Sequence, residues 1–192
     1  MNRRYFVKGV IATAALAVGA PSIYEWLRLS RKPDLQYLVS RKKLIGELAE
    51  TIIPETDSPG AKSAGVEEYI IYCVSNNLPR KEVNCFIDGL HKVEHYCLKK
   101  YDTTYEKCSI ANKNEVFSML PNSRLYHNNN FLKKVDRKFR GRSFFTLFRE
   151  LTIIGYCTSE PGATKGLAYD FVPGSYESCI SLKKNQKAWA TK

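Results

Sequence analysis

Apolar residues recur at helical spacing through most of the chain. The clearest stripe has a period near 3.6 residues and contains Val83, Phe86, Ile87, Leu90, Val93, Cys97 and Tyr101. Pro79 stands just before it, a residue that suits the first turn of a helix. This pattern predicts a long helix that buries one face.

Two shorter helices are predicted before this one. The first begins near Leu44, with Ser40 as its N-cap and Pro54 as its stop. The second starts near Gly65 and ends near Asn76. Between them the sequence is rich in turn-forming residues, which predicts a loop.

The second half of the chain is less regular. It predicts a short helix over 112–120, a polar loop over 122–130 and a strong helix over 143–156. The expected buried face of that last helix comprises Phe144, Leu147, Phe148, Leu151 and Ile154.

Residues 157–182 break the periodicity with repeated prolines and glycines. Long irregular segments are uncommon in small domains and are usually functional or held by something else. This one also contains many apolar side chains, so it either completes the domain's own core or lies against a partner.

These patterns predict a mainly α protein with a single small helical domain and a long irregular C-terminal segment. With 192 residues, one domain is expected. We divide the chain into an export signal (1–20), a linker (21–40), the helical domain (41–182) and a basic, mobile tail (183–192).

The N-terminus has the form of an export signal. A basic segment containing Arg3, Arg4, Phe6 and Lys8 precedes an apolar run from Gly9 to Ala20. The paired arginines resemble a twin-arginine signal, which predicts export of the folded chain to the periplasm. The run is shorter than the roughly 20 residues that span a bilayer. Cleavage and retention as an anchor both remain open, because Pro21 follows an otherwise acceptable cleavage site.

The formal net charge is +11, from 30 Lys and Arg against 19 Asp and Glu. Such a charge suits either solvated basic faces or an anionic partner. An exported protein rarely meets nucleic acid, so we expect no nucleic-acid partner. The alternative function is an independent exported protein that binds an anionic membrane surface or another partner.

Recognisable catalytic and cofactor motifs are absent from the sequence. It has no Cys-x-x-Cys-His for haem, no phosphate-binding glycine loop and no nucleophile elbow. His91 and His95 have metal-ligand spacing, but charged neighbours indicate a solvated face. We therefore assign no catalytic, cofactor-binding or metal residue. An independent enzyme would need a site built from distant carboxylates such as Glu50, Glu55 and Asp57.

The six cysteines are Cys73, Cys85, Cys97, Cys108, Cys157 and Cys179. Disulfides suit an exported protein, although buried, reduced cysteines are an equal alternative. Cys85 and Cys97 stand about 18 Å apart on one predicted helix and cannot pair. Cys97 could reach Cys108 if a turn at 102–104 reverses the chain. Cys179 is our candidate for a disulfide to a partner chain.

Two segments carry a family resemblance. Residues 48–62 read Leu-Ala-Glu-Thr-Ile-Ile-Pro-Glu-Thr-Asp-Ser-Pro-Gly-Ala-Lys, and residues 151–164 read Leu-Thr-Ile-Ile-Gly-Tyr-Cys-Thr-Ser-Glu-Pro-Gly-Ala-Thr. Both resemble signatures of the gluconate 2-dehydrogenase subunit 3 family, and residues 172–179 continue the second. Asn2 departs from the serine or threonine usual in the export motif.

The resemblance implies a non-catalytic small subunit of a membrane-associated dehydrogenase for sugars, sugar acids or polyols. Its partner would be an FAD-containing flavoprotein of the glucose–methanol–choline class, often joined by a multi-haem cytochrome c subunit. The small subunit would supply the export signal and assist assembly of the flavoprotein. The complex would lie at the periplasmic face of the inner membrane, with peripheral membrane association.

The proline- and glycine-rich segments are the expected partner interface, since stiff segments lose less entropy on docking and aromatic residues favour interface cores. The residues assigned to it are Pro54, Asp57, Pro59, Gly60, Tyr156, Thr158, Glu160, Pro161, Gly162, Tyr169, Phe171, Pro173, Gly174 and Tyr176. The aromatic members could instead complete the domain's own core.

Overall fold

The computed structural model describes residues 27–120, 141–172, 174, 179, 181 and 184–190. Over these residues the chain is mainly helical and contains no strand, which confirms the predicted fold class. Its elements are α2 (Leu35–Ser40), α3 (Lys42–Ile52), α4 (Val66–Asn76), α5 (Arg80–Tyr101), η1 (Tyr105–Lys107), α6 (Ile110–Met119), α8 (Phe144–Thr158) and η3 (Gly162–Gly166). The expected polar loop at 122–130 lies outside the described residues.

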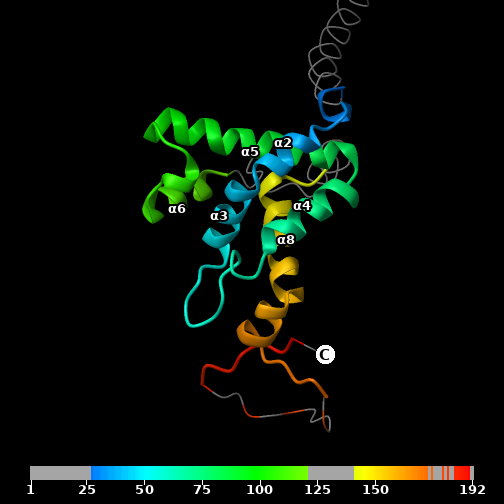
Figure 1. Ribbon diagram of the computed structural model, residues 1–192, viewed down its shortest axis with the longest axis vertical. Coiled ribbons are helices and arrows are strands. Elements are labelled where there is room, and N and C mark those ends of the chain that lie inside the picture. The colour runs from blue at the N-terminus through cyan, green and yellow to red at the C-terminus, as the bar shows by residue number, and fades with distance from the viewer. Residues whose placement is uncertain are drawn as a thin grey trace, which may run out of the picture.

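Helix α8 organises the packing. It contacts α3, α4 and α5 and runs through the middle of the molecule in Figure 1, with α6 at the side of the upper part. The rings of Phe86, Phe144 and Phe148 form a cluster with centroids 5.2 to 5.9 Å apart. A Cβ atom at Gly89 would lie 2.1 Å from Cγ of Phe144, so glycine is what allows α5 and α8 to approach this closely.

The long apolar stripe is confirmed as the buried face of α5. Its first six members, from Val83 to Cys97, are each at most 3% exposed. Pro79 is the N-cap of α5, one position before the first turn in which we expected it. Burying a side chain of this size contributes about 1.5–3 kcal/mol, so this face alone fixes where α5 must lie.

Two details of the predicted helices are wrong. Ser40 is not the N-cap of α3, because it ends α2 and its hydroxyl donates to the carbonyl of Tyr37. Ile154 is 46% exposed rather than buried. In α8 the buried residue that follows Leu151 is Gly155, four positions later, rather than Ile154, three positions later. Ile154 therefore lies on the outer face of the helix.

The segment assigned to a linker contributes to the fold. Residues 27–30 are helical, and Asp34 is the N-cap of α2, with a carboxylate that accepts from the backbone N–H of Tyr37 at 2.9 Å. Leu38 of α2 is fully buried in the core. This helix is only six residues long, too short to give a clear periodic pattern, so the sequence pattern did not reveal it.

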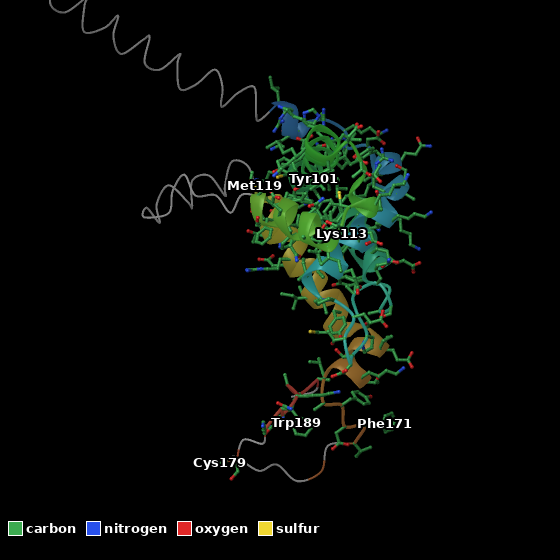
Figure 2. The ribbon with its side chains drawn as sticks, turned by 90° about the vertical axis from the view of Figure 1, so that its left-hand side faces the viewer. Tyr101, Lys113, Met119, Phe171, Cys179 and Trp189 are labelled. Carbon is green, nitrogen blue, oxygen red and sulfur yellow. The ribbon has the colours of Figure 1, made fainter. Side chains whose placement is uncertain are left out.

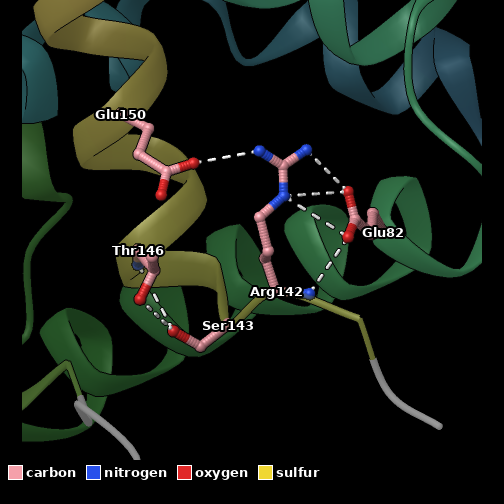
Figure 3. A network of polar contacts seen from close by, with 5 residues as sticks. All are labelled: Glu82, Arg142, Ser143, Thr146 and Glu150. Atoms are coloured by element: carbon pink, nitrogen blue, oxygen red, sulfur yellow. Dashed lines mark hydrogen bonds and ion pairs between the residues drawn. The ribbon is translucent and has the colours of Figure 1, made fainter. Parts of the chain in front are cut away.

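An ion-pair network holds the start of α8 against α5 (Figure 3). The Arg142 guanidinium donates to Glu82 Oε2 at 2.9 Å and to Glu150 Oε2 at 2.9 Å, and the Arg142 backbone N–H donates to Glu82 Oε1 at 3.1 Å. Gly141 adopts a φ of +82°, and a Cβ atom there would lie 2.7 Å from Cγ of Glu82. Glycine at 141 therefore allows the arginine to reach the buried carboxylate.

Burial acts to raise the pKa of Glu82, but hydrogen bonds and charge from Arg142 outweigh it and hold that pKa below its usual range. A carboxyl with a depressed folded pKa stabilises the fold above the unfolded pKa, near 4.3, and loses that contribution as pH falls through the folded value. The network therefore stabilises the protein at neutral pH and weakens in acid.

We expect Arg142→Met to lower the free energy of unfolding by about 3 kcal/mol at pH 7, because Glu82 is left buried without its partner. Denaturant unfolding monitored by circular dichroism measures this loss. The deficit should shrink as the pH falls through the lowered pKa of Glu82, where the carboxyl becomes neutral in the folded protein. Arg149→Met, which removes an exposed arginine from α8, is the matched control and should cost under about 0.5 kcal/mol. Equal stability of the two variants would contradict this account.

Candidate partner interface

Glu50 organises the loop between α3 and α4. Its carboxylate accepts from the backbone N–H groups of Glu55, at 2.7 Å, and Lys62, at 2.9 Å. A Cβ atom at Gly60 would lie 2.3 Å from Oε1 of Glu50, so only glycine fits beneath the carboxylate. Glu50 is thus engaged in shaping the loop, while Glu55 and Asp57 are exposed to solvent.

Glu47, one turn before Glu50, secures the same loop to α6. Its two carboxylate oxygens pair with the ammonium groups of Lys62, at 2.6 Å, and Lys113, at 2.7 Å. Burial acts to raise the pKa of Glu47, but hydrogen bonds from both lysines prevail and lower it. Two of the chain's many cations are therefore used to hold the fold together.

Tyr156 joins the two signature segments. Its hydroxyl donates to the carbonyl of Pro59 at 2.8 Å, and the residue is only 7% exposed. A Cβ atom at Gly166 would lie 2.3 Å from the Tyr156 hydroxyl oxygen, and one at Gly162 would lie 2.0 Å from its carbonyl oxygen. The two glycines therefore make room for the tyrosine, and the loop and the end of α8 become one rigid unit.

The chain after α8 is more regular than the sequence predicted. After a break at Ser159, whose backbone is extended, residues 160–161 and η3 return to helical backbone, and the Leu167 backbone N–H donates to the Gly162 carbonyl at 2.9 Å. Ser159 supports this turn by accepting from the Gly162 N–H at 3.1 Å. Pro161 precedes η3 with helical backbone angles, so its presence does not end the helical path. The long irregular segment that we expected from residue 157 therefore starts later, at Leu167, apart from the break at Ser159.

Two backbone hydrogen bonds bring the end of the chain back to residue 168. The Ala168 N–H donates to the Ala188 carbonyl, and the Ala190 N–H donates to the Ala168 carbonyl, both at 2.8 Å. Ala168 and Trp189 form an isolated parallel bridge. Residues 188–190 of the tail that we expected to be mobile are therefore paired with the main body of the chain.

Large apolar side chains are exposed next to this bridge. They are Tyr169 at 46%, Phe171 at 84%, Val172 at 71% and Trp189 at 56%, and we call these four residues the C-terminal apolar surface. Figure 2 shows Phe171 and Trp189 at the far end of the molecule from the α5 and α6 region. Exposed aromatic residues gathered in one region are typical of an interaction surface.

The predicted interface residues fall into distinct classes. Gly60, Tyr156 and Gly162 are buried within the chain, and Pro59 and Pro161 are partly buried. The exposed residues are Pro54, Asp57, Thr158, Glu160, Tyr169, Phe171 and Gly174, together with Cys179. Pro173 and Tyr176 lie outside the described residues. Val172 and Trp189 are also exposed here but were not among the assigned interface residues, although a tryptophan within a lysine-rich tail was a usable signal.

Within the described ranges, no group of three or more His, Cys, Asp or Glu side chains could hold a metal ion. His91 and His95 are exposed, and the His91 ring stacks on Tyr37 with centroids 4.1 Å apart. Over the same part of the chain, no helix combines the length and apolar character needed to cross a membrane.

Comparisons with known proteins agree with the segments described above. The family model described as gluconate 2-dehydrogenase subunit 3 matches residues 40–174. A comparison with curated proteins finds no match, and neither does one with solved structures. The family match covers well over half of the chain and spans both signature segments with the helices between them. The chain therefore belongs to the gluconate 2-dehydrogenase subunit 3 family, and is by that membership a small subunit of a dehydrogenase complex that associates with other dehydrogenase subunits.

Proposed function

We propose that this chain is the non-catalytic small subunit of a periplasmic, FAD-dependent dehydrogenase of the glucose–methanol–choline class. The complex oxidises a sugar, a sugar acid or a polyol. FAD and the catalytic residues belong to the large flavoprotein subunit, and haem belongs to a multi-haem cytochrome c subunit where one is present. This chain supplies the export signal and assists assembly of the flavoprotein.

The observation that carries the proposal is the C-terminal apolar surface. Phe171 and Trp189 are more than half exposed, and water is a poor environment for side chains of this size. Burying a phenylalanine contributes about 1.5–3 kcal/mol, so a partner that covered this surface would gain much of its binding energy there. Permanent complexes bury about 2,000 Å² or more, so the exposed signature residues would extend the contact beyond these four side chains.

The 53–65 loop and the end of α8 support this surface. Tyr156 holds the 53–65 loop against the end of α8, and the Ala168 bridge begins two residues after η3. A surface held in place before binding loses less conformational entropy when the partner docks. This suits a subunit that must grip an already folded flavoprotein in the cytoplasm.

The export role is carried by Arg3 and Arg4, which lie outside the described residues. A twin-arginine signal on this chain would move the flavoprotein with it, since that route transports folded proteins. The small subunit must then bind before transport, and this requires an interface in addition to a signal.

The charge distribution favours a protein partner over an anionic membrane as the main target. Many of the basic residues are engaged by acids within the chain, as Arg41 is by Glu94, Lys42 by Glu68 and Arg142 by Glu82. Membrane attraction of this electrostatic kind needs unpaired basic charge concentrated on one face. The net charge alone therefore gives weak support to the membrane alternative.

Phe171→Ser should weaken binding of the flavoprotein subunit about 30-fold, the effect expected of a central interface aromatic. Its melting temperature should not change, because the side chain is 84% exposed in the isolated chain. Affinity is measured by titrating the purified flavoprotein. Ile110→Ser removes a similarly exposed apolar residue, 79% exposed, from α6 and is the matched control. Equal affinities for the two variants would exclude this surface from the interface.

Changing Arg3 and Arg4 together to lysine should leave the flavoprotein in the cytoplasm. The reason is that the twin-arginine machinery recognises the arginine pair, and the partner is expected to have no signal of its own. Dehydrogenase activity in the periplasmic fraction should fall by roughly 10-fold or more, while the total amount of flavoprotein in the cell is unchanged. Arg80→Lys, at an exposed position on α5, is the control. Normal periplasmic activity in the double variant would overturn the carrier role.

A further inference from the structure

The connection between α5 and α6 brings two cysteines together. Helix α5 ends at Tyr101, and Asp102 adopts a left-handed conformation with φ of +50°, which reverses the chain. The short helix η1 follows, and the Cys108 N–H donates to the Tyr105 carbonyl as that helix ends. Cys108 is thereby returned to the core beside the last part of α5, where it and Cys97 belong to one buried cluster and the two thiols interact.

Both thiols are buried in the core. Cys97 is 0% exposed and Cys108 is 7% exposed. Burial raises the pKa of Cys97 to about 12, and the neighbouring Cys108 adds to this effect. Tyr105 packs beside them with no exposed surface, and its hydroxyl lies 2.8 Å from that of Thr51. The pair is therefore uncharged and enclosed while it is reduced.

The other cysteines have different surroundings. Asn77 lies 3.9 Å from the Cys73 sulfur, and the Cys85 thiol donates to the Arg142 carbonyl at 3.6 Å. Cys157 and Cys179 are exposed. In the described part of the chain no metal-binding group of three or more ligands includes either Cys97 or Cys108. A structural metal therefore does not account for their contact.

We propose that Cys97 and Cys108 are a disulfide-forming pair that closes residues 97–108 into a covalent loop after the chain reaches an oxidising compartment. The oxidant is a disulfide, R–S–S–R, of a small thiol or of a thiol oxidase. Two protein thiols and one R–S–S–R give one intrachain disulfide and two R–SH, so two electrons pass from the cysteines to the oxidant.

The difference in burial sets the order of the two steps. Cys108, the more accessible thiol, loses its proton and attacks one sulfur of the oxidant, and the first R–S⁻ leaves and takes up a proton. Cys97 then attacks the Cys108 sulfur of the mixed disulfide, and the second R–SH is released with the Cys97 proton. Because the reacting group is the thiolate, the raised pKa of Cys97 makes this second step slow while the fold stays closed.

Only the choice of compartment rests on the proposed function. A chain exported in the folded state would carry the reduced pair across the membrane and acquire the bond afterwards. The bond would then fasten η1 and the start of α6 to α5. The chemistry of the pair depends on its geometry alone, so a test on the purified chain succeeds or fails independently of the partner and of export.

The test uses the full-length chain incubated with oxidised glutathione, then unfolded, alkylated and digested. Mass spectrometry should find the peptides containing Cys97 and Cys108 joined by a disulfide, with Cys73 and Cys85 alkylated. The oxidised protein should melt roughly 5–10 °C above the dithiothreitol-reduced protein, since the cross-link restricts a short loop in the unfolded chain.

The variant Cys97→Ala/Cys108→Ala should lose this difference in melting temperature, whereas Cys73→Ala/Cys157→Ala, a pair on α4 and α8, should keep it. Complete alkylation of Cys97 and Cys108 after oxidation would overturn the proposal, as would a disulfide from either one to a different cysteine. The peptide mapping is done on the unaltered chain, so it stands even where a variant folds poorly.

Discussion

The hydrogen bond from the Tyr156 hydroxyl to the Pro59 carbonyl holds together two parts of the chain that are 97 residues apart. It fixes the end of α8 against the loop that follows α3. Gly166 leaves room for the Tyr156 hydroxyl and Gly162 for the Tyr156 carbonyl, while Gly60 leaves room for the Glu50 carboxylate in the same loop. Glycines of the signature segments therefore serve the packing of the chain, because they leave room for one tyrosine and one carboxylate.

Ion pairs complete the structure in a strongly basic chain. Glu82 secures the start of α8 through Arg142, and Glu47 secures the loop through Lys62 and Lys113. Both carboxyls have lowered pKa values because hydrogen bonds from cations outweigh burial. Glu47 and Glu82 are thus each matched by at least one cation, and at neutral pH these networks stabilise the helical body that supports the C-terminal apolar surface.

The sequence predicted the elements that rest on long periodic stripes. Helix α5 follows its stripe closely, since packing and local preference agree there. The pattern was less informative where a contact from elsewhere in the chain decides the structure. Ile154 is exposed because the buried face of α8 shifts to Gly155, and Leu38 is buried although α2 is too short to show a clear periodic pattern.

Sequence reasoning was also unable to show which residues of the candidate interface are exposed. Gly60, Tyr156 and Gly162 were assigned to a partner surface on their residue types, and the structure shows them packed against one another or against Glu50. A sequence pattern shows that a position is constrained, but the three-dimensional neighbours show whether the constraint is internal. Tyr169 and Phe171 are exposed as an interface would need, and Trp189 joins them only because the chain returns to Ala168.

Hydrogen–deuterium exchange on the chain, alone and in the complex purified from its native cell through a tag on this chain, tests the central claim most directly. The account predicts that complex formation slows exchange at residues 167–172 and 187–190, with little change along α5. Protection confined to α5 and α6, or recovery of the tagged chain without any bound flavoprotein, would contradict it.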